Sequence, residues 1–297
     1  MSHEVHQKLE DQKLRQVLAV AIQAALEAGD YFRSRLDTEL HVKTKSSPSD
    51  LVTDVDPECE RRIRAQISAA FPTHSILGEE TTAPGSEASL QAAQKVQGQD
   101  HLWIVDPLDG TTNFVYGIPV SVVSIGYAQN GKLKAGVVYD PYRAEVFLGM
   151  DSHGAYLASS ADADAFAQNP LGALPGRELS VTKRTRLEES VVATGFPTRS
   201  SERERTTEAG IRLSGQVKNL RAMGSAALHL AYVAAGRLDA FWEYDLNAWD
   251  LAAGVLLIQA AGGFAGDMNG AEYHLATRDI VASGDIELSR KIREAIG

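Results

Sequence analysis

The chain has 297 residues, of which 44% are hydrophobic, enough to bury a sizeable core in one large domain or two joined ones. Its 29 lysines and arginines stand against 39 aspartates and glutamates, a formal net charge of −10. This balance argues against a nucleic-acid-binding protein, which usually carries a basic face, although the run Lys183–Arg186 is locally basic.

The single cysteine, Cys59, excludes an internal disulfide and fits a reducing compartment. The polar N-terminal sequence lacks the apolar core of a signal peptide. No apolar run approaches the roughly 18 residues that a membrane-spanning helix needs. We therefore expect a soluble, cytoplasmic protein.

The first hundred residues predict two helices and a strand. Apolar residues recur at helical spacing through residues 5–35. A second helix is expected over residues 57–71, with Asp56 as its N-cap. The run SILGEE, residues 75–80, predicts a short strand that ends in two carboxylates. Residues 81–99 are small and polar, and they predict a mobile loop with at most one helical turn.

A meander of strands is expected next, at residues 120–129, 132–140, 144–150 and 154–159. The first two are joined by Asn130 and Gly131, a pair that suits a type I′ hairpin turn. Residues 159–178 predict a second polar loop, and we place a domain boundary near it.

The remainder of the chain alternates strands and helices, which is typical of an α/β arrangement. Strands are expected at residues 190–195, 238–244 and 279–284. Helices are expected at residues 201–215, 224–236, 249–263 and 287–297.

Carboxylates gather where these elements end. Glu79 and Glu80 end one strand, Asp106 and Asp109 end another, and Asp250 begins an apolar helix. Buried carboxylates are costly unless they are paired, protonated or bound to a cation. An oxygen-rich cluster suits a hard cation such as Mg²⁺.

Each of these features also has a plainer interpretation. Two adjacent glutamates are usually a solvated pair, the sequence Asp-Pro-Leu-Asp-Gly is commonly a turn, and Asp250 alone would serve as a helix N-cap. The specific order of residues in the stretch Trp103–Pro119 favours the metal site.

The residues after the strand add the parts of a phosphate site. The Leu108 carbonyl can point with the neighbouring carboxylates, and Gly110 permits a close backbone approach. The run from Gly110 to Phe114 predicts a helix start, whose free N–H groups bind anions. Thr111 could pass a proton from water to Asp56. A phosphate between such amides and two metal ions is arranged for in-line hydrolysis.

Three motifs stand in order along the chain: GEE at residues 78–80, WIVDPLDGTTNF at 103–114 and WDLAAG at 249–254. Together they resemble the inositol monophosphatase family, and residues 224–243 resemble its bacterial members. The resemblance implies a layered α/β/α/β/α sandwich, usually as a homodimer. It also implies an N-terminal α+β half, residues 1–155, and a C-terminal α/β half, residues 156–297.

The resemblance further implies a set of metal ligands, and it implies inhibition by Li⁺. A first Mg²⁺ would be held by Glu79, Asp106 and the Leu108 carbonyl. A second would be held by Asp106, Asp109 and Asp250. Glu79 would also help to hold a third, weaker ion.

The family roles of the remaining residues surround this metal site. Glu80 would be an acid behind the ligands, Lys45 a lysine near the metals, and Thr111 with Asp56 the dyad that activates the attacking water. The phosphate would be bound by the amides of Gly110, Thr111 and Thr112. The inositol hydroxyls would be contacted by Asp109, Gly224, Ser225 and Glu243.

Other functions stay open at this point. A 3′-phosphoadenosine 5′-phosphate phosphatase would typically continue its motif with Lys-Glu-Phe, whereas this chain has Thr112-Asn113-Phe114. A fructose-1,6-bisphosphatase would need basic residues for a second phosphate, such as Arg199 or Arg221. A partner-binding role in transcription or ribosome-related complexes is the non-enzymatic alternative. His229 is expected to be a core or interface residue.

Overall fold

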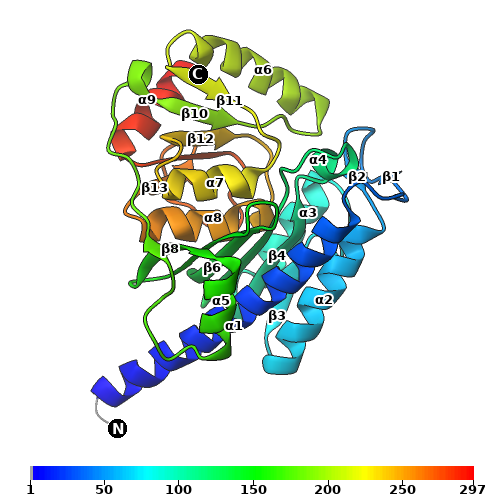
Figure 1. Ribbon diagram of the computed structural model, residues 1–297. Coiled ribbons are helices and arrows are strands. Elements are labelled where there is room, and N and C mark those ends of the chain that lie inside the picture. The colour runs from blue at the N-terminus through cyan, green and yellow to red at the C-terminus, as the bar shows by residue number, and fades with distance from the viewer. Residues whose placement is uncertain (1–2) are drawn as a thin grey trace.

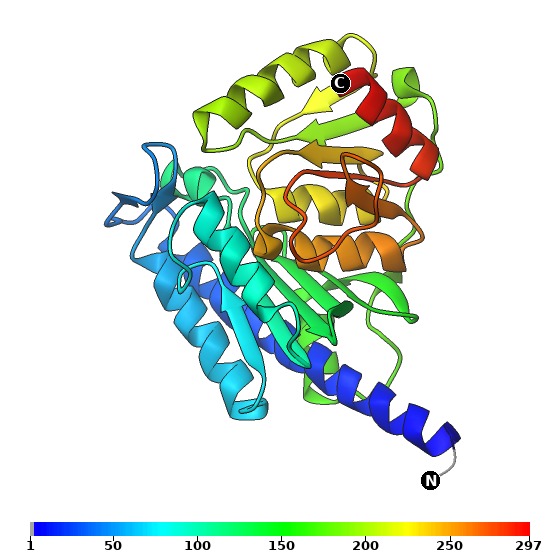
Figure 2. The same cartoon turned by 180° about the vertical axis from the view of Figure 1, so that it is seen from behind.

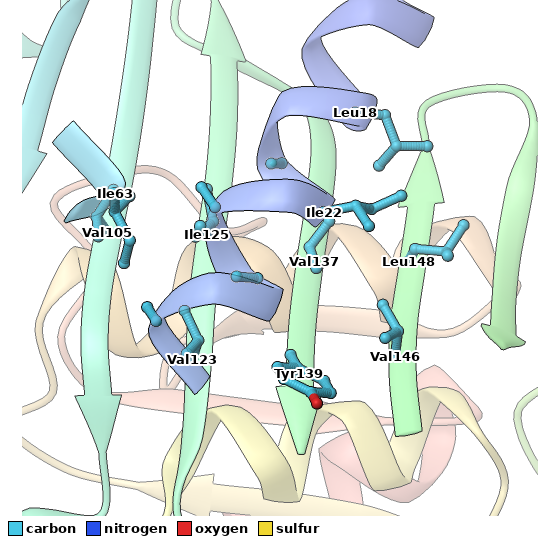
Figure 3. Close-up of a cluster of buried hydrophobic side chains, with 14 of the residues drawn as sticks. Leu18, Ile22, Ile63, Val105, Val123, Ile125, Val137, Tyr139, Val146 and Leu148 are labelled. Atoms are coloured by element: carbon cyan, nitrogen blue, oxygen red, sulfur yellow. The ribbon is translucent and has the colours of Figure 1, made fainter. Parts of the chain in front are cut away.

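Two long helices cover one face of the first sheet. In the computed structural model, which describes residues 3–297, α1 (His3–Arg35) and α2 (Val55–Ala70) lie side by side (Figure 1). Apolar residues at helical spacing place Leu18 and Ile22 of α1 in one buried cluster with strand residues such as Val137 and Leu148 (Figure 3). The helix expected at residues 5–35 is confirmed.

The start of α2 differs from the expected one. Asp54, not Asp56, is the N-cap, so the helix begins at Val55 and Asp56 lies in its first turn. The Asp56 carboxylate nevertheless accepts a hydrogen bond from the backbone N–H of Thr53, at 2.9 Å. The position of this aspartate is therefore fixed by a bond to the chain that precedes the helix.

The first sheet has the strand order β3-β4-β5-β6-β7-β8-β9 within residues 3–297, and β3 and β4 alone are parallel neighbours there. Its strands are β3 (Ser75–Gly78), β4 (His101–Asp109), β5 (Val122–Gln129), β6 (Lys132–Asp140), β7 (Glu145–Met150), β8 (Gly154–Ser159) and β9 (Arg177–Glu178). Asn130 and Gly131 have φ angles of 50° and 75°, which confirms the type I′ hairpin. The register of β4 against β5 shifts between Asp106 and Asp109.

Both segments expected to be loops contain a helix. They are α3 (Ser86–Val96) and α5 (Ser160–Gln168), so these two predictions are wrong. Each helix buries few residues, namely Ser89 and Ala93 in α3 and Ala163, Phe166 and Ala167 in α5, and the rest of each sequence is polar or small. Figure 2 shows α3 on the same side of the sheet as α8 (Ala248–Ala260).

The second sheet has the strand order β11-β10-β12-β14-β13. Its strands are β10 (Val191–Thr194), β11 (Asn219–Arg221), β12 (Ala240–Glu243), β13 (Phe264–Asp267) and β14 (Ile280–Ser283). The short strands β11 and β13 were not expected. The division into halves at residue 155 stays a prediction, and the chain passes from one sheet to the other between β9 and β10.

Helices α7 (Ala226–Ala234) and α8 lie between the two sheets, while α6 (Ser200–Ser214) and α9 (Ile286–Ile296) cover the outer face of the second sheet (Figures 1 and 2). This arrangement confirms the layered α/β/α/β/α sandwich. The shorter elements are β1 (Lys43–Thr44), β2 (Leu51–Val52), α4 (Thr111–Val115) and the 3-10 helix η1 (Leu187–Glu189).

Glycines in the first sheet bring α8 close to it. A Cβ atom on Gly136 would lie 2.8 Å from the carbonyl oxygen of Ala253, and one on Gly126 would lie 2.8 Å from the Ala252 side chain. The close approach holds the start of α8, with Asp250, beside the ends of the central strands. Among the described residues, no helix is both long and apolar enough to cross a membrane.

Candidate active site

The last residues of β4 carry a buried carboxylate. The Asp106 side chain is almost inaccessible and accepts a hydrogen bond from the Leu108 N–H at 3.0 Å. Its pKa lies well above the ordinary aspartate value because of burial and the nearby charges of Glu79, Asp109 and Asp250. The four carboxyl groups are therefore close enough to repel one another when ionised.

Asp109 ties β4 to the start of α7. One carboxylate oxygen accepts hydrogen bonds from the Ser225 hydroxyl at 2.6 Å and from the Ala227 N–H at 2.7 Å. Burial raises the pKa of Asp109 to about 6 although these bonds favour the charged form, and Glu79 adds to the rise. Ser225 is itself the N-cap of α7, so β4 and this helix hold one another in place.

Asp250 lies in the first turn of α8 and is not its N-cap, so the plain N-cap interpretation is wrong. Asn247 is the N-cap, and its backbone N–H donates to the Asp250 carboxylate at 2.7 Å in a capping box. Burial, followed by the charges of Asp109 and Glu79, raises the pKa of Asp250 to about 8.

Glu79 and Glu80 follow β3 directly and share one cation. The Lys45 ammonium lies 2.8 Å from Glu79 Oε1 and 2.6 Å from Glu80 Oε1. Burial alone would lower the pKa of Lys45, but the two carboxylates hold it above its ordinary value. The pKa of Glu80 is raised to about 7 by burial and by the charge of Glu79. Lys45 therefore compensates only the outer edge of the acidic cluster.

Thr111 opens α4 and meets Asp56 from α2. Its hydroxyl lies 3.0 Å from Asp56 Oδ1 and 3.2 Å from the Leu108 carbonyl oxygen, either of which can accept its single hydrogen. Burial raises the pKa of Asp56, which Thr53 opposes through its hydrogen bonds. Gly110 precedes the helix with a φ of 97°, a conformation that favours glycine.

Two adjoining cavities form the cleft above these groups. One, of about 210 Å³, is lined by Lys45, Glu79 and Asp250 among others. The other, of about 730 Å³, is lined by residues from both sheets, including Asp109, Thr112, Gly224 and Ser225. The two cavities share the residues Phe196, Thr198, Glu243, Leu246 and Asp250.

Glu243, at the end of β12, faces both cavities. Its pKa lies well above the ordinary value because of burial and the charges of Asp250 and Asp109. Of the residues that the sequence predicted for the site, eight line these two cavities: Lys45, Glu79, Asp109, Thr112, Gly224, Ser225, Glu243 and Asp250. The other predicted residues, Asp56, Glu80, Asp106, Leu108, Gly110 and Thr111, line neither cavity.

The donor set fits a hard cation. Four mutually repelling carboxylates and a backbone carbonyl are oxygen ligands of the kind that divalent cations prefer. Among the described residues, no three His, Cys, Asp or Glu side chains are already arranged to hold an ion. Asp109 instead bonds Ser225 and Ala227, and Glu79 bonds Lys45.

Sequence reasoning missed two residues that support this site. The buried Glu60 of α2 accepts hydrogen bonds from the Glu80 N–H at 2.7 Å and from Arg64 Nε at 2.7 Å, which fixes the backbone beside Glu79. Gly195 lies against Glu243, because a Cβ there would lie 2.2 Å from Glu243 Oε2. Glu60 shares the buried face of α2 with Asp56, Ile63 and Ile67, and a glutamate at that position gave no distinct signal in the sequence.

Three further candidates fall outside the acidic cluster. Arg199 pairs with Asp245 at 3.1 Å, whereas Arg221 bonds only residues of its own strand and lines neither cavity. His229 is fully buried and accepts the Met223 N–H at 3.1 Å, as expected of a core residue. Burial lowers its pKa to about 3.

Comparison with known proteins agrees with this geometry. The sequence profile of the inositol monophosphatase family matches residues 13–296. The Nus factor SuhB of Pseudomonas aeruginosa is 40% identical, over 91% of this chain and 92% of that protein. An inositol-1-monophosphatase of Mesorhizobium japonicum is 37% identical, over 94% and 96%. The crystal structure of the extragenic suppressor protein suhB from Bartonella henselae superposes with a TM-score of 0.78 at 35% identity, covering 94% of this chain and 98% of that one.

The fold and the matches define a phosphoric monoester hydrolase, an enzyme class that acts on small phosphorylated substrates. The chain belongs to the inositol monophosphatase family. Members of this family generally depend on a metal ion, in agreement with the donor set described above.

Proposed function

We propose that this protein hydrolyses an inositol monophosphate, myo-inositol 1-phosphate, to inositol and phosphate with the help of Mg²⁺. The observation that carries the proposal is the position of the Thr111 hydroxyl, between the carboxylate of Asp56 and the carbonyl of Leu108. This places a proton acceptor next to carboxylates that burial and repulsion leave in need of a cation.

The metal ligands in this proposal are Glu79, Asp106, the Leu108 carbonyl, Asp109 and Asp250, with two ions and, as an alternative, a third at Glu79. Bound Mg²⁺ would supply a water of lowered pKa and would offset the charge that develops on the phosphoryl oxygens. The raised pKa values of Asp106 and Asp250 support this assignment, because burial and, after it, the repulsion between neighbouring carboxylates cause them, and a bound cation would offset both.

The chain's own groups would bind the ester and move the proton. The amides of Gly110, Thr111 and Thr112, at the start of α4, would hold the phosphate oxygens. The Thr111 hydroxyl would take the proton of the attacking water as it passes its own to Asp56. The raised pKa of Asp56 supports its role as the acceptor.

The alcohol part of the ester would lie in the larger cavity. Asp109, Gly224, Ser225 and Glu243 line this cavity and offer carboxylate and hydroxyl groups, which suit the hydroxyls of a polyol. Asp109 is oriented there by its bonds to Ser225 and Ala227. The proposal further includes Li⁺ inhibition, a cytoplasmic location and a homodimer, the last of which light scattering in solution tests.

A partner-binding role is a second candidate, and one comparison favours it. The Pseudomonas aeruginosa relative at 40% identity is named a Nus factor, a name that belongs to transcription. We propose this role only as an addition to catalysis, because the acidic cluster and the Thr111–Asp56 pair are complete in this chain.

The experiment is phosphate release from myo-inositol 1-phosphate, fructose 1,6-bisphosphate, 3′-phosphoadenosine 5′-phosphate and glycerol 2-phosphate. Each ester is measured with Mg²⁺, without Mg²⁺ and with added Li⁺. The proposal expects Mg²⁺-dependent, Li⁺-inhibited release that is fastest from the inositol ester. A folded protein that binds Mg²⁺ and turns over none of the esters would leave the partner-binding role as the better account.

A further inference from the structure

A further buried carboxylate, that of Asp245, faces the same cleft, but it is paired with arginine side chains. Asp245 lies two residues after Glu243 and, together with Arg278, lines the cavity that Glu79 and Asp250 also line. Only 4% of its side chain is exposed. Its φ of 58° lies in the left-handed region, which costs energy for most residues and least for Asn, Asp and Gly. The chain therefore holds this carboxylate in place at some cost.

Two guanidinium groups converge on Asp245. Arg278 Nη2 lies 2.8 Å from Oδ1, and Arg199 Nε lies 3.1 Å from Oδ2. The Ser86 hydroxyl, from the start of α3, also donates to Oδ2 at 2.9 Å. Both carboxylate oxygens are therefore occupied by donors from three separate segments.

Arg278 has almost no capacity left for another anion. It donates to Asp245 Oδ1 through Nε and Nη2, to the Asp245 carbonyl through Nη2, and to Asn247 Oδ1 through Nη1 at 2.9 Å. These four bonds engage a group that has five N–H donors in all. Arg199 is likewise shared between Asp245 and Glu202.

The surrounding cluster is electrically neutral. Three carboxylates, those of Glu202, Asp245 and Asp279, face three guanidinium groups, those of Arg199, Arg205 and Arg278. Removing the charge of Asp245 would leave a net positive charge at the wall of the cleft. A phosphate group attracts guanidinium donors, and it is repelled by a carboxylate that is paired with them.

We propose that Asp245 is a specificity-determining residue: by neutralising Arg278, which lines the cleft, and Arg199, which pairs with the same carboxylate, it excludes esters that carry a second phosphate group. Substrates whose alcohol part is uncharged are favoured as a result. This inference rests on the proposed function, since it requires the ester to bind in the cleft between Glu79 and Glu243.

The test compares matched esters that differ only in the second phosphate. One pair is myo-inositol 1-phosphate and myo-inositol 1,4-bisphosphate, and the other is fructose 1-phosphate and fructose 1,6-bisphosphate. The measured quantity is the ratio of kcat/KM for the bisphosphate to kcat/KM for the monophosphate, in the full-length protein with Mg²⁺. In the unmodified protein this ratio is expected to be below one in both pairs.

Asp245→Asn removes the charge and keeps a residue that tolerates a positive φ. It is expected to raise the ratio about tenfold, because the charge of Arg278, which lines the cleft, is then no longer neutralised. Adding Arg278→Gln to this variant should remove most of the gain. The matched control is Asp279→Asn, which removes one carboxylate from the same cluster at a residue that lines neither cavity, and it should leave the ratio within about twofold.

Each outcome supports or overturns either the role of Asp245 or the proposed substrate. An unmodified protein that prefers either bisphosphate overturns the inference even if Asp245→Asn fails to fold. A folded Asp245→Asn protein with an unchanged ratio, or an equal gain in Asp279→Asn, also overturns it. If the fructose pair behaves as expected while myo-inositol 1-phosphate is not hydrolysed, the specificity role stands and the proposed substrate fails.

Discussion

One cleft contains buried carboxylates in two different environments: those at the end of β4 repel one another, whereas that of Asp245 is paired with arginine side chains. At the end of β4, Asp106 and Asp109 lie close to Asp250, and burial and mutual repulsion raise the pKa values of all three, although the charge of Arg278 partly opposes the rise at Asp250. In the same cleft, Asp245 instead pairs with Arg278 at 2.8 Å and with Arg199 at 3.1 Å.

This difference in pairing distinguishes carboxylates that need a ligand from carboxylates that only support the fold. A buried carboxylate with a matched cation from the chain already has a stable state, so it needs no ligand. A cluster left uncompensated has a stable state only when protons or an external cation supply the missing charge. The acidic end of the cleft is therefore the place that requires a ligand, and the Asp245 wall is the place that selects among ligands.

The largest expected effect is at the uncompensated end. Asp106→Asn should lower kcat/KM for the preferred monoester by about 10³-fold or more, because a shared metal ligand is lost. The same change should raise the melting temperature of the metal-free protein, since it removes one of the repelling charges. Calorimetry and steady-state kinetics measure the two effects. Full activity in Asp106→Asn would contradict the catalytic assignment.

The proton path gives the next largest effect. Thr111→Ala should lower kcat about 10²-fold with little change in KM, because the water loses the hydroxyl that accepts its proton. Thr111→Ser keeps a hydroxyl within reach of Asp56 and is the matched control, expected to retain most of the rate. Equal losses in the two variants would mean that the methyl group, and not the hydroxyl, is what matters.

The pH dependence of stability tests whether the carboxylates of the acidic cluster hold protons in the folded, metal-free protein. The pKa values of Asp109, Glu80 and Asp250 are raised to about 6, about 7 and about 8, so the folded protein keeps protons that the unfolded chain releases. The stability of the metal-free protein should therefore fall as pH rises from about 6 to about 8. The buried His229, whose pKa is lowered from 6.5 to about 3, has the opposite effect between these two values, so it opposes the fall only at the acidic end of the range. Melting temperatures across this range check the sign, and a rise would contradict it.

The smallest expected effect concerns the substrate side of the cleft. Gly195→Ala places a Cβ within 2.2 Å of Glu243 Oε2, so the glutamate must move. KM for the inositol ester should rise about tenfold while kcat changes less. Gly215→Ala, at a glycine with no atom near the added Cβ, is the control and should leave KM unchanged. An unchanged KM in Gly195→Ala would remove Glu243 from the binding site.

Much of this arrangement could be predicted from local patterns. The long amphipathic helix, the Asn130-Gly131 hairpin and the three motifs that carry the carboxylates all depend on neighbouring residues, so the sequence states them directly. The two missed helices, α3 and α5, bury so few residues that their sequences look like loops. The start of α2 was misplaced because Asp56 bonds Thr53 instead of capping the helix.

The supporting contacts could not be predicted, for a physical reason. Glu60 reaches Glu80 from another element, and Asp245 meets Arg278 thirty-three positions later in the chain. Such pairs form only when the fold brings distant segments together, and neither Glu60 nor Asp245 belongs to a motif. The same holds for Gly195, whose role follows from its contact with the Glu243 side chain and not from its neighbours in sequence.

The most direct test of the comparison is the melting temperature of the protein at neutral pH with and without millimolar Mg²⁺, measured beside Asp106→Asn and Asp245→Asn. The account predicts that Mg²⁺ raises the melting temperature of the unmodified protein and of Asp245→Asn, and raises that of Asp106→Asn much less. Equal responses in all three, or no response in the unmodified protein, would contradict a cation site at the end of β4.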